Sequence, residues 1–243
     1  FNIGVEGQYY FAALVAAIVG AWFTLPSVLH VLVILLVAMA AGAFLAAIAG
    51  VLKATRGVNE VISSIMLNNI ILGGFGAWML TRARFDDGSG SLQIATEPIA
   101  ASGRIPNLNG WLDAIGIDVP AGSRLTGFLL IAIAVGVAYY VVIWRTRFGY
   151  DLRSSGFNPF AATSSGVDAK GMVVKAMLVS GGIAGLVGMS QLLVEDGRFA
   201  GDFPTGIGFT GIAVALVGRN HPVGVGLAAL LWGFMERSAQ RLD

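Results

Sequence analysis

Five long apolar stretches divide this chain, and four of them contain no charged residue. They cover residues 9–25, 28–52, 61–80, 125–144 and 172–193. The hydrocarbon core of a bilayer is about 30 Å thick, and a helix needs about 20 apolar residues to cross it. Each stretch is near that length, so the sequence predicts an all-α fold, a polytopic transmembrane helical bundle.

The composition agrees with a membrane protein and excludes several other functions. The mean hydropathy is +0.78, and only 12% of residues are charged, against about 25% in soluble domains. A net charge of +1 gives no basis for binding nucleic acid, and the absence of cysteine excludes disulfides and thiolate metal sites. Because no phosphate-binding loop, zinc-protease motif or serine-nucleophile motif occurs, we expect no catalytic residues, no cofactor and no metal. Any ATP hydrolysis would take place on another chain.

The basic residues predict which polar segments face the cytoplasm. The segment 145–175 carries five basic residues against two acids, whereas the long region 81–124 carries four arginines against five acids. Cytoplasmic loops of membrane proteins are enriched in Lys and Arg. We therefore expect the segment 148–170 inside the cell and the region 81–124 outside it.

The end of the chain carries two shorter apolar runs, 207–217 and 223–234. Eleven or twelve helical residues cannot cross a bilayer, since each adds about 1.5 Å. The two runs therefore predict a discontinuous or re-entrant helix pair. Broken helices occur at membrane depth only where they are buried in protein or line a wet cavity, which favours a transporter or a channel.

A few polar residues lie within or beside the apolar stretches. Asn68 and Asn69 occupy the middle of the third stretch, and Asn2, Glu6 and Gln8 precede the first. They could bind a polar solute, or the amides could form interhelical hydrogen bonds of about 0.6–2 kcal/mol. Glu6 could also complement the dipole of its own helix. The sequence leaves these interpretations open.

The segment 148–170 contains a short predicted helix over 159–164. Asn158 is a favourable N-cap, Pro159 suits the first helical position, and Gly166 can end the helix. A short capped helix between two membrane spans suits the docking of a peripheral partner, which a solvated loop would not require.

Four sequence stretches together resemble a known family. They are FNIGVEGQ at 1–8, GVNEVISSIMLNNI at 57–70, LRSSGFNPFAATSSGV at 152–167 and GIGFTGIAVALVGRNHPVG at 206–224. In this order they resemble the permease subunit of bacterial ABC importers for nucleosides, simple sugars and branched-chain amino acids, and most closely the nucleoside-type members. The resemblance extends over nearly the whole chain.

The resemblance implies one permease domain over residues 1–243, in a bacterial cell membrane. It implies four kinds of partner: a second permease, identical or related, two cytoplasmic ATPase subunits, an external substrate-binding lipoprotein that meets 81–124, and the solute. Because such permeases usually have further spans, we expect that the sequence is truncated at both ends. The residues it assigns to ATPase coupling are Arg153, Gly156, Asn158, Pro159, Phe160, Ala161, Ala162 and Gly166. The family usually has an acid and a base where this chain has Phe160 and Thr163, so docking is expected to be more apolar.

Taken with the polar residues, this resemblance predicts import of a small polar solute, most favourably a nucleoside. The residues expected along its path are Asn2, Glu6, Gln8, Asn68 and Asn69. The alternatives are a ribose-type sugar importer of the same family and a proton- or sodium-coupled secondary transporter. The latter would need an acid or histidine deep in a span, and the second to fifth stretches have none at mid-depth.

Overall fold

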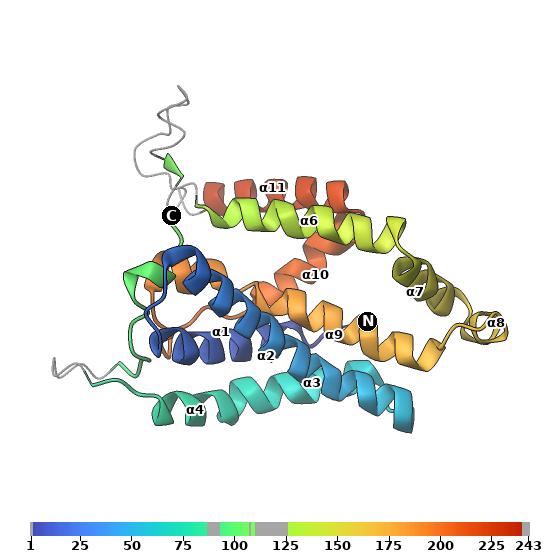
Figure 1. Ribbon diagram of the computed structural model, residues 1–243, viewed down its shortest axis with the longest axis horizontal. Helices are drawn as coiled ribbons and strands as arrows, with labels where there is room; N and C mark the ends of the chain where they lie inside the picture. The colour runs from blue at the N-terminus through green and yellow to red at the C-terminus, as the bar shows by residue number, and fades with distance from the viewer. Residues whose placement is uncertain (1, 87–92, 107, 110–125, 240–243) are drawn as a thin grey trace.

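A computed structural model describes residues 2–86, 93–106, 108–109 and 126–239, and it confirms the all-α fold (Figure 1). The elements named below for these residues are all helices, and an isolated antiparallel bridge joins Ala95 to Ala200. Parts of the region 81–124 and the start of the fourth stretch lie outside the described residues. The elements are α1 (Val5–Ala21), α2 (Ser27–Arg56), α3 (Glu60–Ile70), η1 (Ile71–Phe75), α4 (Gly76–Arg82), η2 (Ala101–Gly103), α6 (Phe128–Arg145), α7 (Arg147–Phe157), α8 (Pro159–Ser164), α9 (Ala169–Gly185), η3 (Gln191–Asp196), α10 (Ile207–Val217) and α11 (Pro222–Ala239).

Three helices in the described part of the chain are long and apolar enough to cross a membrane. They are α2, the continuous run from α3 through η1 to α4, and α6. The apolar helices α1 and α10 are shorter, and α1, at 17 residues, reaches the lower limit for a span. It covers 5–21 rather than the predicted 9–25. The helix ends at Ala21, and Pro26 disfavours helical backbone only in the residue before it, Leu25.

The core is formed by α1, α2 and α9, which pack through small residues. Contacts of Gly42 with Gly185 and of Gly50 with Val174 show that α2 and α9 run antiparallel. Alanine side chains of α1 and α2 fill the remaining space, including Ala12, Ala16 and Ala38, all fully buried. Small residues let helix backbones approach closely. Membrane helices associate through such close packing because lipid is itself apolar, so burying apolar side chains contributes little.

The fifth apolar stretch is not the single helix that was predicted. Helix α9 begins earlier, at Ala169, where the Asp168 carboxylate accepts a hydrogen bond from Gly171 N at 3.0 Å. It ends at Gly185, and after a turn the chain continues into the π-helix η3. The glycines in this stretch weaken the helix, since each is about 1 kcal/mol less favourable than alanine. A discontinuity therefore occurs here as well as in the final pair.

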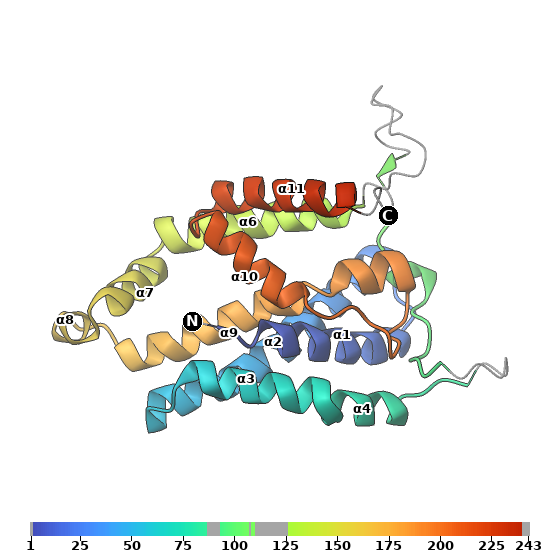
Figure 2. The ribbon, with the colours of Figure 1, turned by 180° about the vertical axis from the view of Figure 1, so that it is seen from behind.

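The final pair consists of α10 and α11, joined by a tight turn. Arg219 and Asn220 in this turn adopt left-handed backbone conformations, with φ of 55° and 56°. Helix α11 has 18 residues and continues to Ala239, beyond the predicted run 223–234, because helix formation does not stop where apolar residues give way to charged ones. It lies alongside α6 in both views (Figures 1 and 2).

The two ends of the molecule carry different segments. Helices α7 and α8 lie at one end together with the connection between α2 and α3 (Figure 1). The segment 93–106 pairs with the loop 197–203 that follows η3, where Thr96 N donates to Phe199 O at 2.8 Å and Ile99 N to Gly197 O at 2.8 Å. Helix α7 was not predicted. The residue in the sequence that indicates its start is Thr146, an N-cap whose hydroxyl accepts a hydrogen bond from Gly149 N at 3.2 Å.

Candidate functional site

A neutral polar cluster lies at the start of α1. The amides of Asn2 and Gln8 exchange two hydrogen bonds, with Asn2 Nδ2 donating at 2.9 Å and Gln8 Nε2 donating back at 3.0 Å. Asn2 Nδ2 also donates to Ser180 Oγ on α9 at 2.9 Å. Gly4 makes room for the pair, because a Cβ atom there would lie 2.5 Å from Gln8 Nε2. The cluster presents amide and hydroxyl groups and no charge.

Glu6 is buried, and its carboxylate caps a helix distant in sequence. Its oxygens accept hydrogen bonds from the backbone N–H groups of Gly206 and Gly208, the latter at 2.9 Å, and from the Tyr9 hydroxyl at 3.0 Å. Gly206 is the N-cap of α10 and has no side chain to satisfy these groups. The carboxylate thus complements the dipole of α10 through these hydrogen bonds, and Glu6 also lies in the first turn of its own helix.

The two neighbouring asparagines of α3 have different environments. Asn68 is buried, and its Oδ1 accepts from Gly7 N at 2.9 Å while its Nδ2 donates to Ile3 O at 3.0 Å. Both ends of this amide therefore join α3 to the start of α1. Asn69 is exposed and donates to Ile65 O of its own helix at 3.0 Å. The structure brings Asn2, Glu6, Gln8 and Asn68 together and leaves Asn69 outside this group.

Two further residues near these groups were not assigned a role from sequence. Ser64 is fully buried, and its hydroxyl has no hydrogen-bond partner among the described residues. Its Cβ would lie 3.3 Å from a Cβ atom on Gly4, beside the Asn2–Gln8 pair. Ser180 joins that pair from α9, and no sequence pattern indicates it.

His30 is a buried residue to which the sequence assigned no role. One ring nitrogen lies 2.8 Å from Ser102 Oγ and the other 2.9 Å from Gly20 O. The imidazole therefore connects the segment around η2 to the α1–α2 hairpin. No group of three His, Cys, Asp or Glu side chains in the described residues is arranged to hold a metal ion.

The short helix α8 has the predicted bounds and the predicted cap. Asn158 Oδ1 accepts hydrogen bonds from Phe160 N at 3.0 Å and from Ala161 N at 3.1 Å, and Pro159 occupies the first turn. Gly166 follows the helix with φ of 84°. Phe160 is 87% exposed, whereas Ala162 is buried against neighbouring helices. The exposed aromatic ring is an apolar feature on a surface that faces away from the core.

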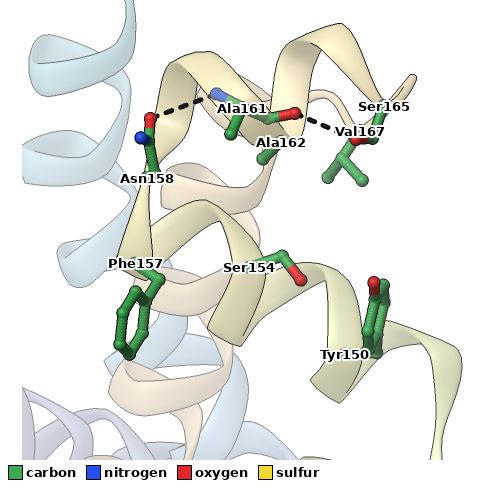
Figure 3. A pocket seen from close by; sticks show the side chains of 8 residues that line it. All are labelled: Tyr150, Ser154, Phe157, Asn158, Ala161, Ala162, Ser165 and Val167. Atoms are coloured by element: carbon green, nitrogen blue, oxygen red, sulfur yellow. Dashed lines mark hydrogen bonds between the residues drawn. The ribbon is translucent and has the colours of Figure 1, made fainter.

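Helices α7 and α8 enclose a shallow pocket of about 310 Å³ (Figure 3). It is lined by Tyr150, Ser154, Phe157, Asn158, Ala161, Ala162, Ser165 and Val167. Arg153 of α7 donates to the carbonyl of Ile143, which ties α7 to the end of α6. Gly156 lies on the exposed side of α7 with nothing near its missing Cβ atom. The coupling residues expected from sequence therefore lie on two joined helices at one end of the molecule.

The apolar helices, their close packing through small residues and the buried polar cluster define a helical membrane protein. The chain belongs to the family described as branched-chain amino acid transport system / permease component, which matches residues 1–242. This confirms the family that the four sequence stretches indicated.

Several relatives are similar over almost the whole chain. A guanosine ABC transporter permease protein of Bacillus subtilis is 37% identical over 243 residues, a glucose ABC transporter permease protein of Haloferax volcanii 35% over 236, and a nucleoside ABC transporter permease protein of Lactococcus lactis 31% over 245. The alignments cover 98%, 97% and 98% of this chain and 66%, 61% and 65% of the relatives. The chain thus spans about two thirds of their length or slightly less. No solved structure gave a significant match.

Proposed function

We propose that this chain is the transmembrane permease part of an ATP-driven importer for a small polar solute, most favourably a nucleoside. The observation that carries the proposal is the family match over residues 1–242, with relatives named for guanosine and for nucleosides at 37% and 31% identity. The importer would lie in a bacterial cell membrane, which the chain would cross several times, with 81–124 outside and 148–170 in the cytoplasm.

The solute path is proposed to run past the start of α1. A nucleoside is uncharged, with hydroxyl groups and an aromatic base, and suits amide and hydroxyl partners better than a strong charge. Asn2 and Gln8 supply such groups, with the hydroxyl of Ser64 beside them. Glu6 and Asn68 would shape the wall of the path through their contacts with α10 and α1. Asn69, on the exposed face of α3, would meet the solute only where a second permease completes the path.

Energy is proposed to enter through α8. Two ATPase subunits would bind beneath the permease pair, and ATP binding would move α7 and α8 as a rigid unit and switch the cavity between its two openings. The exposed ring of Phe160 would dock in an apolar cleft of the ATPase. An external lipoprotein would deliver the solute. Because the ATPase subunits would hydrolyse the ATP, this chain itself would have no enzymatic activity.

One observation supports an alternative solute, a simple sugar. The 35% identity to a glucose permease supports a simple-sugar solute in place of a nucleoside, and a sugar also suits neutral polar partners. A proton- or sodium-coupled secondary transporter has less support, because the relatives are named ABC transporter permeases.

The test uses the complete transporter in proteoliposomes that enclose ATP. With the external binding protein present, we expect uptake of labelled guanosine that requires hydrolysable ATP and resists an uncoupler. Excess unlabelled nucleoside should compete, and excess ribose or glucose should not. Competition by the sugars alone would favour the sugar importer, and uptake abolished by the uncoupler would contradict the ATP-driven mechanism.

A further inference from the structure

The side-chain hydrogen bonds between α1 and the start of α10 converge on one carboxylate. Glu6 accepts one hydrogen bond from Gly206 N, at the N-cap of α10, and one from Gly208 N in its first turn. The Tyr9 hydroxyl reinforces the junction, because it donates a hydrogen bond to Glu6 or to Pro204 O, 2.9 Å away, just before α10. We refer to this group of hydrogen bonds as the Glu6–α10 contact.

Gly208 brings the two backbones together at the same place. A Cβ atom on Gly208 would lie 2.8 Å from Glu6 N and 3.0 Å from Glu6 Cα, closer than real side chains approach. Only glycine therefore fits here without moving α10 away from α1. By contrast, Gly211 has nothing within 4 Å of its missing Cβ atom, although it lies on the same helix.

The other end of α10 connects to the helices that carry α8. In the turn after α10, Asn220 O accepts a hydrogen bond from the Tyr139 hydroxyl of α6 at 3.2 Å, and the His221 ring lies 5.8 Å from that of Trp144. The end of α6 is tied to α7 through Arg153 and the Ile143 carbonyl. Figure 2 shows α10 crossing from the core to the paired helices α6 and α11.

The start of α1 holds the neutral polar cluster on the same helical turns as Glu6. Gln8 follows Glu6 by two residues, and Gly7 between them donates to Asn68. A displacement of α10 at the Glu6–α10 contact therefore acts directly on the backbone that positions Asn2, Gln8 and Asn68.

We propose that the Glu6–α10 contact transmits movement of α7 and α8, through α6 and α10, to the polar cluster at the start of α1. Glu6 and Gly208 are then positioning residues that set how much transport each hydrolysed ATP produces. This inference rests on the proposed function. It adds to it a specific mechanical connection between the two ends of the chain.

The chemistry of the contact explains why substitution should loosen it. A carboxylate offers acceptor oxygens to both N–H groups and places negative charge at the positive end of α10. The Glu6→Gln side chain has the same shape but turns one acceptor into an NH₂ donor, which faces a backbone N–H. The Gly208→Ala side chain separates the two helices sterically. Two unrelated changes thus weaken one junction.

The first experiment compares solute transported per ATP hydrolysed in the complete transporter in proteoliposomes. Gly208→Ala should lower this ratio by about fivefold or more, the lower range for coupling between sites. ATPase activity and the yield of assembled complex should stay near the native values. Gly211→Ala is the matched control and should leave the ratio unchanged. Equal falls in uptake and ATPase activity, or an unchanged ratio, would overturn the inference.

A second measurement reports on the junction without using transport. Spin labels on Gly211→Cys in α10 and Val51→Cys at the exposed end of α2 give the distance between α10 and the core. Adding Glu6→Gln should broaden this distance distribution, and an unchanged distribution would contradict the Glu6–α10 contact as the connection. If the native complex transports no nucleoside or sugar, the proposed function fails, and the spin-label result still decides whether Glu6 holds α10.

Discussion

Gly42 and Gly185 bring α2 and α9 into contact backbone to backbone. A Cβ atom on Gly42 would lie 2.9 Å from the Gly185 nitrogen and would clash with the carbonyl oxygen of Gly181. A Cβ on Gly185 would in turn clash with the Ala38 carbonyl oxygen. The central helix pair therefore depends on the absence of side chains on both partners.

Adding one methyl group at this crossing should destabilise the protein. We expect Gly42→Ala to cost about 1–3 kcal/mol, the usual range for overpacking a core. The measurement is thermal unfolding of the purified protein in detergent. Gly136→Ala in α6 is the control, since nothing lies within 4 Å of its missing Cβ atom, and it should not lower the melting temperature. Equal melting temperatures for the two variants would rule out the close crossing.

The two adjacent asparagines of α3 should respond differently to the same change. Asn68→Leu leaves the buried Gly7 N without its partner, at about 1–3 kcal/mol, and also removes the partner of the partly buried Ile3 O. Asn69→Leu removes a hydrogen bond only within its own exposed helix turn and should be nearly neutral for stability. Thermal unfolding again provides the comparison, and a larger loss for Asn69→Leu would contradict the assignment.

The Asn158 side chain should determine how well α8 is held. Asn158→Ala removes the acceptor for two backbone N–H groups and should weaken the helix by about 1 kcal/mol, whereas Asn158→Asp keeps an acceptor at the same place. Hydrogen exchange of the Phe160 and Ala161 amides measures this directly. We expect faster exchange in the alanine variant alone. Similar exchange in both variants would show that the cap does not hold the helix.

The exposed aromatic ring on α8 should matter for assembly and not for folding. Phe160→Asp should leave the melting temperature unchanged, because the ring is 87% exposed, but should weaken ATPase binding by about 2 kcal/mol or more if it is a central contact. Phe160→Leu, which stays apolar, should lose much less. Co-purification with the ATPase measures the effect. Ala162→Asp is unsuitable as a test, since Ala162 is buried and its change would disturb folding.

The features that the sequence predicted correctly depend on neighbours in the chain. Helix α8 followed from Asn158 and Pro159, because capping acts within one turn. The family followed from four motifs in order. The break after Gly185 was missed, because apolarity alone does not reveal where glycines, packed against another helix, interrupt a long stretch.

The contacts of the polar residues depend on the fold and could not be predicted. Glu6 lies in the first turn of its own helix, one of the positions expected, but its hydrogen-bond partners are Gly206 and Gly208, about 200 residues away in the chain. The two glycines lie in the stretch 206–224 that resembles the family, and Glu6 lies in the stretch 1–8. No sequence pattern indicates that residues so far apart in the chain are in contact. Asn68 and Asn69 are alike in sequence, and only the packing of α1 against α3 distinguishes them.

The π-helical turn η1 gives the helix run 60–82 a spare residue. A π-turn takes one more residue than an α-turn, so the helix can lose one residue there and return to the ordinary repeat. Leu80 beyond the turn would then keep its buried side toward the core, whereas the same deletion within α2 would rotate everything after it by about 100°. The length of this helix is thus adjustable at one place, between Ile71 and Phe75, without rebuilding its packing.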